Sequence, residues 1–263
     1  MGIAANIAED WHAALAALAW QVEAGADETI LDAPLNRYEL SAEAPKPLSA
    51  KASLPAALPS APGAADPVAV AKSLAEQAPT LGALQSALTA FDHCDLKKGA
   101  RSTVFSDGNP QARVLILGEA PGAEEDREGR PFVGRAGQLL DRMFAAIGLS
   151  RTSQNAETAL YITNVMPWRP PGNRDPEPAE IAMMLPFVER HIALVDPKVI
   201  VVVGNTPLFA LTGTKGILRA RGAWSQALGK PLLPMTHPAY LLRNPSAKRE
   251  AWADLLSLQA RLR

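Results

Sequence analysis

The chain is poor in the residues that mark several classes of protein. Its 263 residues include one cysteine, and aromatic residues make up only 5% of the sequence. The single cysteine, Cys94, excludes an internal disulfide and cannot by itself hold a zinc or iron-sulfur centre. No apolar run reaches the roughly 18 residues of a membrane-spanning helix, and the first residues lack a basic segment followed by an apolar one. We therefore expect a cytoplasmic protein with no membrane partner.

The chain has almost no net charge, −1 in total, but its charged residues are distributed unevenly. Residues 1–90 hold 10 acidic and 4 basic side chains, a net charge of −6, so the remaining residues carry +5. A basic body with an acidic appendage is compatible with a nucleic-acid partner. Many enzymes have a similar balance, so charge alone leaves the partner open.

Composition divides the chain into three parts. Residues 1–40 form a predicted helical arm, with a helix from Trp11 to about Ala24 whose apolar stripe either packs on the protein's own body or binds a protein partner. Residues 41–67 are rich in Ala, Pro and Ser and are predicted to be a linker, because they bury little apolar surface. Residues 68–263 are long enough to form one core of ordinary size.

Strand and helix patterns alternate from residue 114 onward. Repeated β-α units of this kind form a mostly parallel sheet that helices cover on both faces. The sequence thus predicts a three-layer α/β/α sandwich around a mostly parallel, four-stranded sheet, in a monomer. The predicted strands are 114–117, 161–165, 199–203 and 232–235. The predicted helices are 68–77, 81–91, 136–146, 177–195 with a break near Pro186, 206–211 and 247–262.

A loop that is rich in glycine, proline and carboxylates follows the first of these strands. It reads GEAPGAEEDREGRPFVGRAGQ from Gly118 to Gln138, and the other three strands end in NVMPWRPPGNR, GNT and THPAYLLRNP. Loops after parallel strands meet at one edge of the sheet, where open α/β sheets bind ligands. We expect the functional site at this edge. An unrelated dinucleotide-binding enzyme is disfavoured, since no G-x-G-x-x-G follows the first strand.

In these four loops the chain resembles the uracil-DNA glycosylase superfamily, and within it family 4, whose members usually carry an iron-sulfur cluster. The resemblance runs from about Phe91 to the carboxyl terminus. It is carried in order by GEAPG with PFVGRAGQLL, ITNV with RPPGNR, RGAW and HPAYLLRNP. It implies a DNA repair enzyme that flips uracil out of DNA and hydrolyses its N-glycosidic bond, leaving an abasic site. The alternative is a non-catalytic DNA-binding or repair-recruitment protein on the same fold.

The resemblance also implies roles for residues of the pocket. Phe132 is expected to stack on the base, and Asn164 to read its edge, because an amide can donate to O4 and accept from N3–H of uracil whereas cytosine reverses this pattern. His237 is expected to donate to O2 as negative charge collects on the departing base. Glu119 is the favoured carboxylate for positioning water, with Glu125 as the alternative or a shared contributor. Gly118 and Ala120 are expected to line the substrate site.

A further set of residues is expected to bind DNA. Leu241 and Leu242 would act as an apolar wedge in the base stack, while Arg243 holds a phosphate. Basic residues around the loops would clamp the DNA backbone. They are Arg135, Arg169, Arg174 and Arg221, with Lys248 and Arg249 as further candidates.

The chain departs from family 4 at the cluster ligands. Aligned by motif, the four cysteine positions of the family hold Phe91, Cys94, Trp168 and Met183. Three thiolates are thus replaced by large apolar side chains, so a cluster that needs cysteine ligands is not expected. We therefore expect no cofactor and no metal, and hypothesise that Phe91, Trp168 and Met183 pack together in the place of the cluster.

Overall fold

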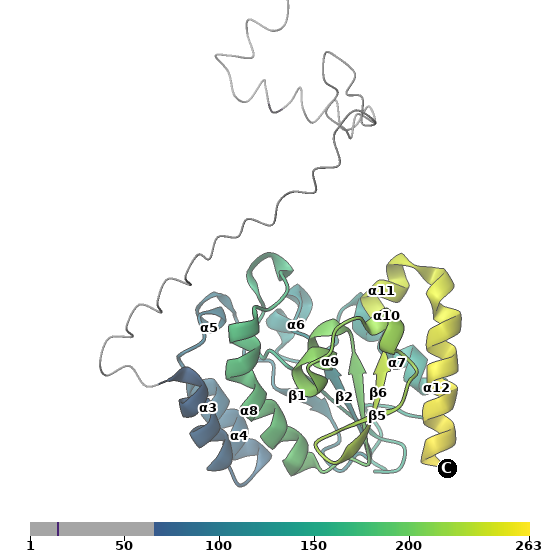
Figure 1. Cartoon of the computed structure of the whole chain (residues 1–263), viewed down its shortest axis with the longest axis horizontal. Coiled ribbons are helices and arrows are strands. Elements are labelled where there is room, and N and C mark those ends of the chain that lie inside the picture. The colour runs from purple at the N-terminus through teal and green to yellow at the C-terminus, as the bar shows by residue number, and fades with distance from the viewer. Residues whose placement is uncertain (1–14, 16–65) are drawn as a thin grey trace, which may run out of the picture. The chain divides into compact units, whose positions relative to one another are not determined.

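The structure is a computed structural model that describes Leu15 and residues 66–263 (Figure 1). The predicted arm, residues 1–40, and the predicted linker, residues 41–67, lie outside the described residues except for Leu15 and residues 66 and 67. The division of the chain into three parts therefore stays a prediction. The first described helix begins at Pro67, where the Asp66 carboxylate accepts a hydrogen bond from the Val68 amide at 3.1 Å.

A six-stranded sheet lies at the centre of the fold, in the order β1-β3-β2-β4-β6-β5. The inner four strands are parallel, and an antiparallel strand flanks them on each side. The strands are β1 (Ser106–Gly108), β2 (Val114–Gly118), β3 (Leu160–Asn164), β4 (Val199–Val203), β5 (Ser225–Ala227) and β6 (Lys230–Met235). The four predicted strands are confirmed as the parallel centre.

The two antiparallel edge strands, β1 and β5, are a correction to the predicted four-stranded sheet. Each is three residues long and, except for Ala227, not fully buried, so neither carries the apolar pattern that reveals a buried strand. β5 pairs with β6 through a two-residue turn in which Leu228 and Gly229 have φ values of 52° and 73°. Turns of this kind favour Asn-Gly or Asp-Gly, so a Leu-Gly pair does not predict a hairpin.

Helices cover both faces of the sheet. Leu115 and Leu117 of β2 join an apolar cluster with α3, α4, α8 and α9, whereas Val114 and Ile116 join a second cluster with α7 and α12. Figure 1 shows the sheet between α8 and α12. The predicted three-layer α/β/α sandwich is therefore confirmed. The helices are α3 (Pro67–Glu76), α4 (Leu81–Ala90), α5 (Leu96–Gly99), α6 (Ala123–Glu128), α7 (Arg135–Ala145), α8 (Pro178–Val195), α9 (Asn205–Thr212), α10 (Ile217–Ala220), α11 (Pro238–Arg243) and α12 (Lys248–Leu262), with 3-10 turns η1 (Pro171–Asn173) and η2 (Pro245–Ala247).

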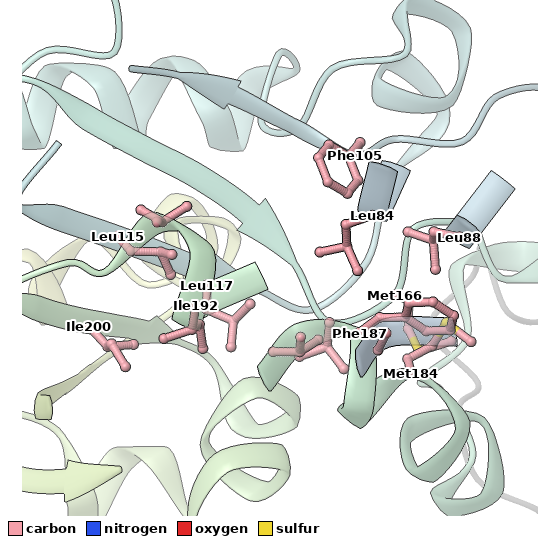
Figure 2. Close-up of a cluster of buried hydrophobic side chains, with 14 of the residues drawn as sticks. Leu84, Leu88, Phe105, Leu115, Leu117, Met166, Met184, Phe187, Ile192 and Ile200 are labelled. Atoms are coloured by element: carbon pink, nitrogen blue, oxygen red, sulfur yellow. The ribbon is translucent and has the colours of Figure 1, made fainter. Parts of the chain in front are cut away.

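The predicted break of α8 near Pro186 is wrong, because the helix continues through this residue. Proline removes one backbone hydrogen bond, and packing of the residues on both sides offsets that loss. Met184 and Phe187 flank the proline and are buried in the first apolar cluster, next to Leu84 and Leu88 of α4 (Figure 2). No helix within the described residues is long and apolar enough to cross a membrane.

Candidate active site

Four loops meet at the carboxyl edge of the parallel strands and enclose a cleft. The cleft consists of two adjoining pockets of about 500 Å³ and 330 Å³. Residues from the loops after β2, β3 and β6 line both pockets. These shared residues are Glu119, Ala120, Asn173, His237, Ala239 and Arg243. These loops therefore converge at one edge of the sheet, as predicted.

Gly118, the last residue of β2, separates two of the predicted base-binding side chains. It is paired in register with Asn164, the last residue of β3. A methyl group on Gly118 would overlap Asn164 Oδ1 and lie 2.5 Å from Cε2 of Phe132. Only the absence of a side chain at Gly118 lets the amide and the aromatic ring come this close. Asn164 Oδ1 is buried and accepts no hydrogen bond from the described residues, and Asn164 is not among the residues that line the two pockets.

The backbone of Phe132 is strained and is held in place by its neighbours. Its φ is 54°, in the left-handed region that costs a non-glycine residue about 1–2 kcal/mol. The buried Arg151 guanidinium donates to the carbonyl oxygens of Pro131 at 2.8 Å and Phe132 at 2.9 Å. Behind it, Gly137 of α7 lies so close that a methyl group there would be 2.7 Å from Phe132 Cα. Strain that the surroundings enforce in this way is typical of functional sites.

Glu125, in the first turn of α6, organises the same loop through its carboxylate. Oε1 accepts hydrogen bonds from the amides of Val133 and Gly134, each at 2.9 Å, and Oε2 accepts one from Gly122 at 3.0 Å. Both oxygens are therefore occupied by backbone donors. Glu125 lines the smaller pocket, but its contacts are those of a group that fixes the shape of the loop.

Glu119, directly after β2, projects a partly buried carboxylate into the cleft. The Thr206 hydroxyl of α9 donates to its Oε2 at 2.6 Å. Burial raises the pKa of Glu119, the hydrogen bond from Thr206 lowers it in part, and the negative charge of Asp175 raises it. Within residues 66–263 no other donor reaches this carboxylate, which leaves Oε1 for a water molecule or a ligand.

His237 caps the amino end of α11 and lies opposite Phe132 in the cleft. Its Nδ1 accepts a hydrogen bond from the Ala239 amide at 3.1 Å, so in the neutral ring the proton is on Nε2. Burial, assisted by the charge of Arg243, lowers the pKa of His237 to about 4. The centroids of the His237 and Phe132 rings are 5.6 Å apart. The cleft thus holds a neutral N–H donor beside an aromatic wall.

The predicted DNA wedge is only partly in agreement with the structure. Leu241 is fully buried against Leu139 and Ala251, so it anchors α11 to α7 and α12 and cannot enter a base stack. Its prediction as a wedge is wrong, because α11 turns this side chain inward. Leu242 is partly exposed and Arg243 is exposed at the rim of the cleft.

The predicted backbone-binding arginines differ in how far other groups engage them. The Arg221 guanidinium pairs with the buried carboxylate of Asp254, with Nε to Oδ2 at 2.9 Å, so it ties the RGAW loop to α12. Arg174 makes a two-pronged ion pair with Glu180, at 2.9 Å and 2.6 Å. Arg169 donates to Asn173 within its own loop. Arg174 is nevertheless exposed, as are Arg135, Lys248 and Arg249.

The four positions aligned with the family's cluster ligands lie in the first apolar cluster. Phe91, Cys94 and Trp168 are almost completely buried there, and Met183 is partly buried and packs against the cluster. The Phe91 ring meets the ring of Phe187 edge-on, with centroids 5.5 Å apart. Figure 2 shows Phe187 among the side chains of this cluster. The cluster joins α4 and α8 to the segment that follows β3, which carries the site.

A protein family and several known proteins match the sequence of this chain. A model of the uracil DNA glycosylase superfamily matches residues 105–256. The chain belongs to the uracil-DNA glycosylase superfamily. The type-4 uracil-DNA glycosylase of Thermotoga maritima is 42% identical over 156 residues, which are 58% of this chain and 78% of the relative. That of Archaeoglobus fulgidus is 38% identical over 173 residues, 61% of this chain and 82% of the relative. The type-5 uracil-DNA glycosylase of Thermus thermophilus is 31% identical over 134 residues, 48% of this chain and 61% of the relative.

These matches confirm the predicted resemblance to the superfamily and to its family 4. Glu119, Phe132, Asn164 and His237 all fall within the residues that match the superfamily. Arg151 and Thr206, which contact Phe132 and Glu119 in this superfamily member, were not predicted from the sequence. Arg151 stands in the polar segment Ser150–Gln154, where nothing marks it as buried, whereas Thr206 belongs to the GNT loop that already stood out at a strand end.

Proposed function

We propose that this uracil-DNA glycosylase takes a flipped uracil into the cleft and hydrolyses its N-glycosidic bond with the side chains of Phe132, Asn164, His237 and Glu119. One observation carries the proposal. The Phe132 ring and the Asn164 amide meet across Gly118, and the imidazole of His237 stands 5.6 Å from the same ring. An aromatic wall, an amide and a neutral N–H donor are what reading and releasing uracil requires.

Asn164 discriminates uracil from cytosine through its side-chain amide. Its buried Oδ1 has no partner among the described residues and accepts the N3–H of uracil, while the amide nitrogen donates to O4. Cytosine presents an acceptor at N3 and a donor at the adjacent position, so both contacts turn unfavourable. The Phe132 ring stacks on the base, a contact worth about 1–3 kcal/mol.

His237 stabilises the departing base. As the bond between C1′ of the sugar and N1 of uracil breaks, its electron pair stays on the base and charge collects on O2. The Nε2–H of a neutral imidazole donates to this oxygen without giving up its proton. Because burial holds the pKa of His237 at about 4, the ring is neutral at physiological pH and its role needs no protonation step.

Glu119 positions the water that attacks C1′ and takes up its proton, while its charge stabilises the positive sugar. We prefer Glu119 to Glu125 because Glu125 has both oxygens engaged by three backbone amides. Glu119 shares only one oxygen, with Thr206. Glu125 acts by shaping the loop that carries Phe132. Arg243 and Leu242, at the rim of the cleft, contact the DNA.

The enzyme works without an iron-sulfur cluster. Of the four positions that hold cluster cysteines in family 4, only Cys94 supplies a thiol, and the indole nitrogen of Trp168 donates to Thr103 at 3.1 Å. These side chains do not fit a four-cysteine cluster. Phe91, Trp168 and Met183 instead form an apolar plug that ties α4 and α8 to the segment after β3. Iron analysis of freshly purified protein checks this, and stoichiometric iron contradicts it.

Activity is tested with a uracil-containing oligonucleotide that is treated with alkali after incubation, so that abasic sites become strand breaks. We expect cleavage by the wild type and its loss in Asn164→Ala and His237→Ala, which keep their fold by thermal unfolding. No cleavage by the wild type would leave the alternative, a non-catalytic DNA-binding or repair-recruitment protein. The monomeric state, the cytoplasmic location and a protein partner for the acidic arm stay predictions.

A further inference from the structure

We propose that Thr206 is a positioning residue of the reaction, holding the Glu119 carboxylate so that Oε1 receives the attacking water. The inference rests on the role proposed above for Glu119. Thr206 lies in the GNT loop after β4, but the sequence motifs assigned it no role. It acts on the substrate only through the carboxylate it holds.

The contact between the two side chains is short and specific. Thr206 Oγ1 donates to Glu119 Oε2 at 2.6 Å, which is the length of a hydrogen bond between a hydroxyl and an ionised carboxylate. Thr206 is itself buried, with 8% of its surface exposed, so the hydroxyl is not free to turn to solvent. A glutamate side chain has three rotatable bonds, and one fixed oxygen restricts the position of the other.

The position of Thr206 in α9 adds to this effect. The helix begins at Asn205, directly after β4, and its first turn contains no acidic residue. The carboxylate of Glu119, which comes from β2, therefore meets the amino end of α9 through the Thr206 hydroxyl. The positive end of a helix dipole stabilises an anion at this place. Asn205 keeps the adjacent loop in place by accepting hydrogen bonds from the amides of Gly216 and Ile217.

Other charged or titratable groups line the same cleft. Asp175, on the loop after β3, raises the pKa of Glu119 by its negative charge, in addition to burial. Arg174, Glu125, His237 and Arg243 also line the cleft. None of these groups donates a hydrogen bond to Glu119 within the described residues, so Thr206 alone fixes the direction of the carboxylate.

Three variants test the inference. Thr206→Val has almost the same shape but no hydroxyl, Thr206→Ser keeps the hydroxyl, and Thr212→Val makes the same change at the far end of α9, where Thr212 bonds only to Leu208 and Thr214. The rate of uracil release is measured in single turnover from pH 4 to pH 9. We expect Thr206→Val to be about tenfold slower or more, the range for a lost hydrogen bond to a charged group, with Thr206→Ser and Thr212→Val close to wild type.

The pH profile gives a readout that a merely structural role would not move. Since the hydrogen bond from Thr206 lowers the pKa of Glu119, its removal raises that pKa and moves the acid limb of the profile to higher pH. We expect this shift in Thr206→Val and its reversal in Thr206→Ser. In Glu119→Gln the limb disappears, and adding Thr206→Val to that variant has little further effect if Thr206 acts through Glu119.

The outcomes separate the two proposals. If Glu119→Gln keeps the wild-type rate, the role of Glu119 is wrong and the inference fails with it. If Glu119→Gln is slow but Thr206→Val matches the wild type in rate and pH profile, only the inference about Thr206 is overturned. Equal additional losses from Thr206→Val with and without Glu119 would also overturn it, because the two residues would then act independently.

Discussion

Gly118→Ala is the substitution whose effect follows most directly from the structure. The added methyl group would overlap Asn164 Oδ1 and lie 2.5 Å from the Phe132 ring. Carbon atoms in contact are normally about 3.5–4.0 Å apart, so the amide, the ring or both must move by about 1 Å. The backbone of Gly118 is that of an ordinary strand, and an alanine there adds no backbone strain. The damage is therefore confined to the two side chains that are proposed to hold the base.

The expected loss is about 100-fold in the single-turnover rate of uracil release, which is typical of a displacement of about 1 Å in a site. Overpacking at a buried position costs about 1–3 kcal/mol in the free energy of unfolding. Gly82→Ala in α4 is the matched control, because a methyl group there meets no atom within 4 Å. We expect this control to keep full activity and gain about 0.4–1 kcal/mol in stability.

The assay combines single-turnover cleavage of a uracil-containing oligonucleotide with denaturant unfolding of each variant. A Gly118→Ala protein that releases uracil within twofold of the wild-type rate would contradict this prediction. In that case Asn164 and Phe132 do not need the spacing that the structure shows. Loss of activity with unchanged stability would still support it, since the ring or the amide can move without harming the core.

Three further predictions concern the groups that support the site. Arg151→Lys keeps the charge but loses the two hydrogen bonds to the carbonyl oxygens of Pro131 and Phe132. We expect uracil release at saturating enzyme to be about tenfold slower, and an unchanged rate would contradict this. Burial lowers the pKa of His191 to about 4, so as pH falls the unfolded chain, with a histidine pKa near 6.5, takes up a proton before the folded protein does. The free energy of unfolding should therefore drop by up to about 3 kcal/mol between pH 6.5 and 4, and His237 acts in the same direction. A free energy of urea unfolding that does not change over this pH range would contradict the prediction. Arg221→Met leaves the buried Asp254 unpaired and should lower the free energy of unfolding, measured with urea, by about 3 kcal/mol. The affinity for DNA should stay near that of the wild type. Weaker DNA binding without loss of stability would instead indicate that Arg221 binds DNA.

Much of the fold was predictable because its central strands are buried on both faces. Val199–Val203 is an unbroken run of β-branched residues, and such runs can be recognised without a partner. The edge strands Ser106–Gly108 and Ser225–Ala227 were not predicted. The first pairs with residues 161–163, which are distant in sequence, and the second follows no buried apolar pattern. The break predicted at Pro186 is absent because the free energy gained by packing the residues around it exceeds the cost of the backbone hydrogen bond that proline removes.

The chemical groups at the site could be identified from the amino-acid sequence. Its motifs named Glu119, Phe132, Asn164 and His237, and placed them at strand ends, because strands and the loops after them are continuous in the chain. Tertiary structure alone decided which of the named groups are available. It turned Leu241 inward, paired Arg221 with Asp254 and occupied both oxygens of Glu125 with backbone amides. It also brought Thr206 and Arg151 to the site. The physical reason is that orientation, burial and hydrogen-bond partners depend on contacts between distant segments, which motif spacing does not encode.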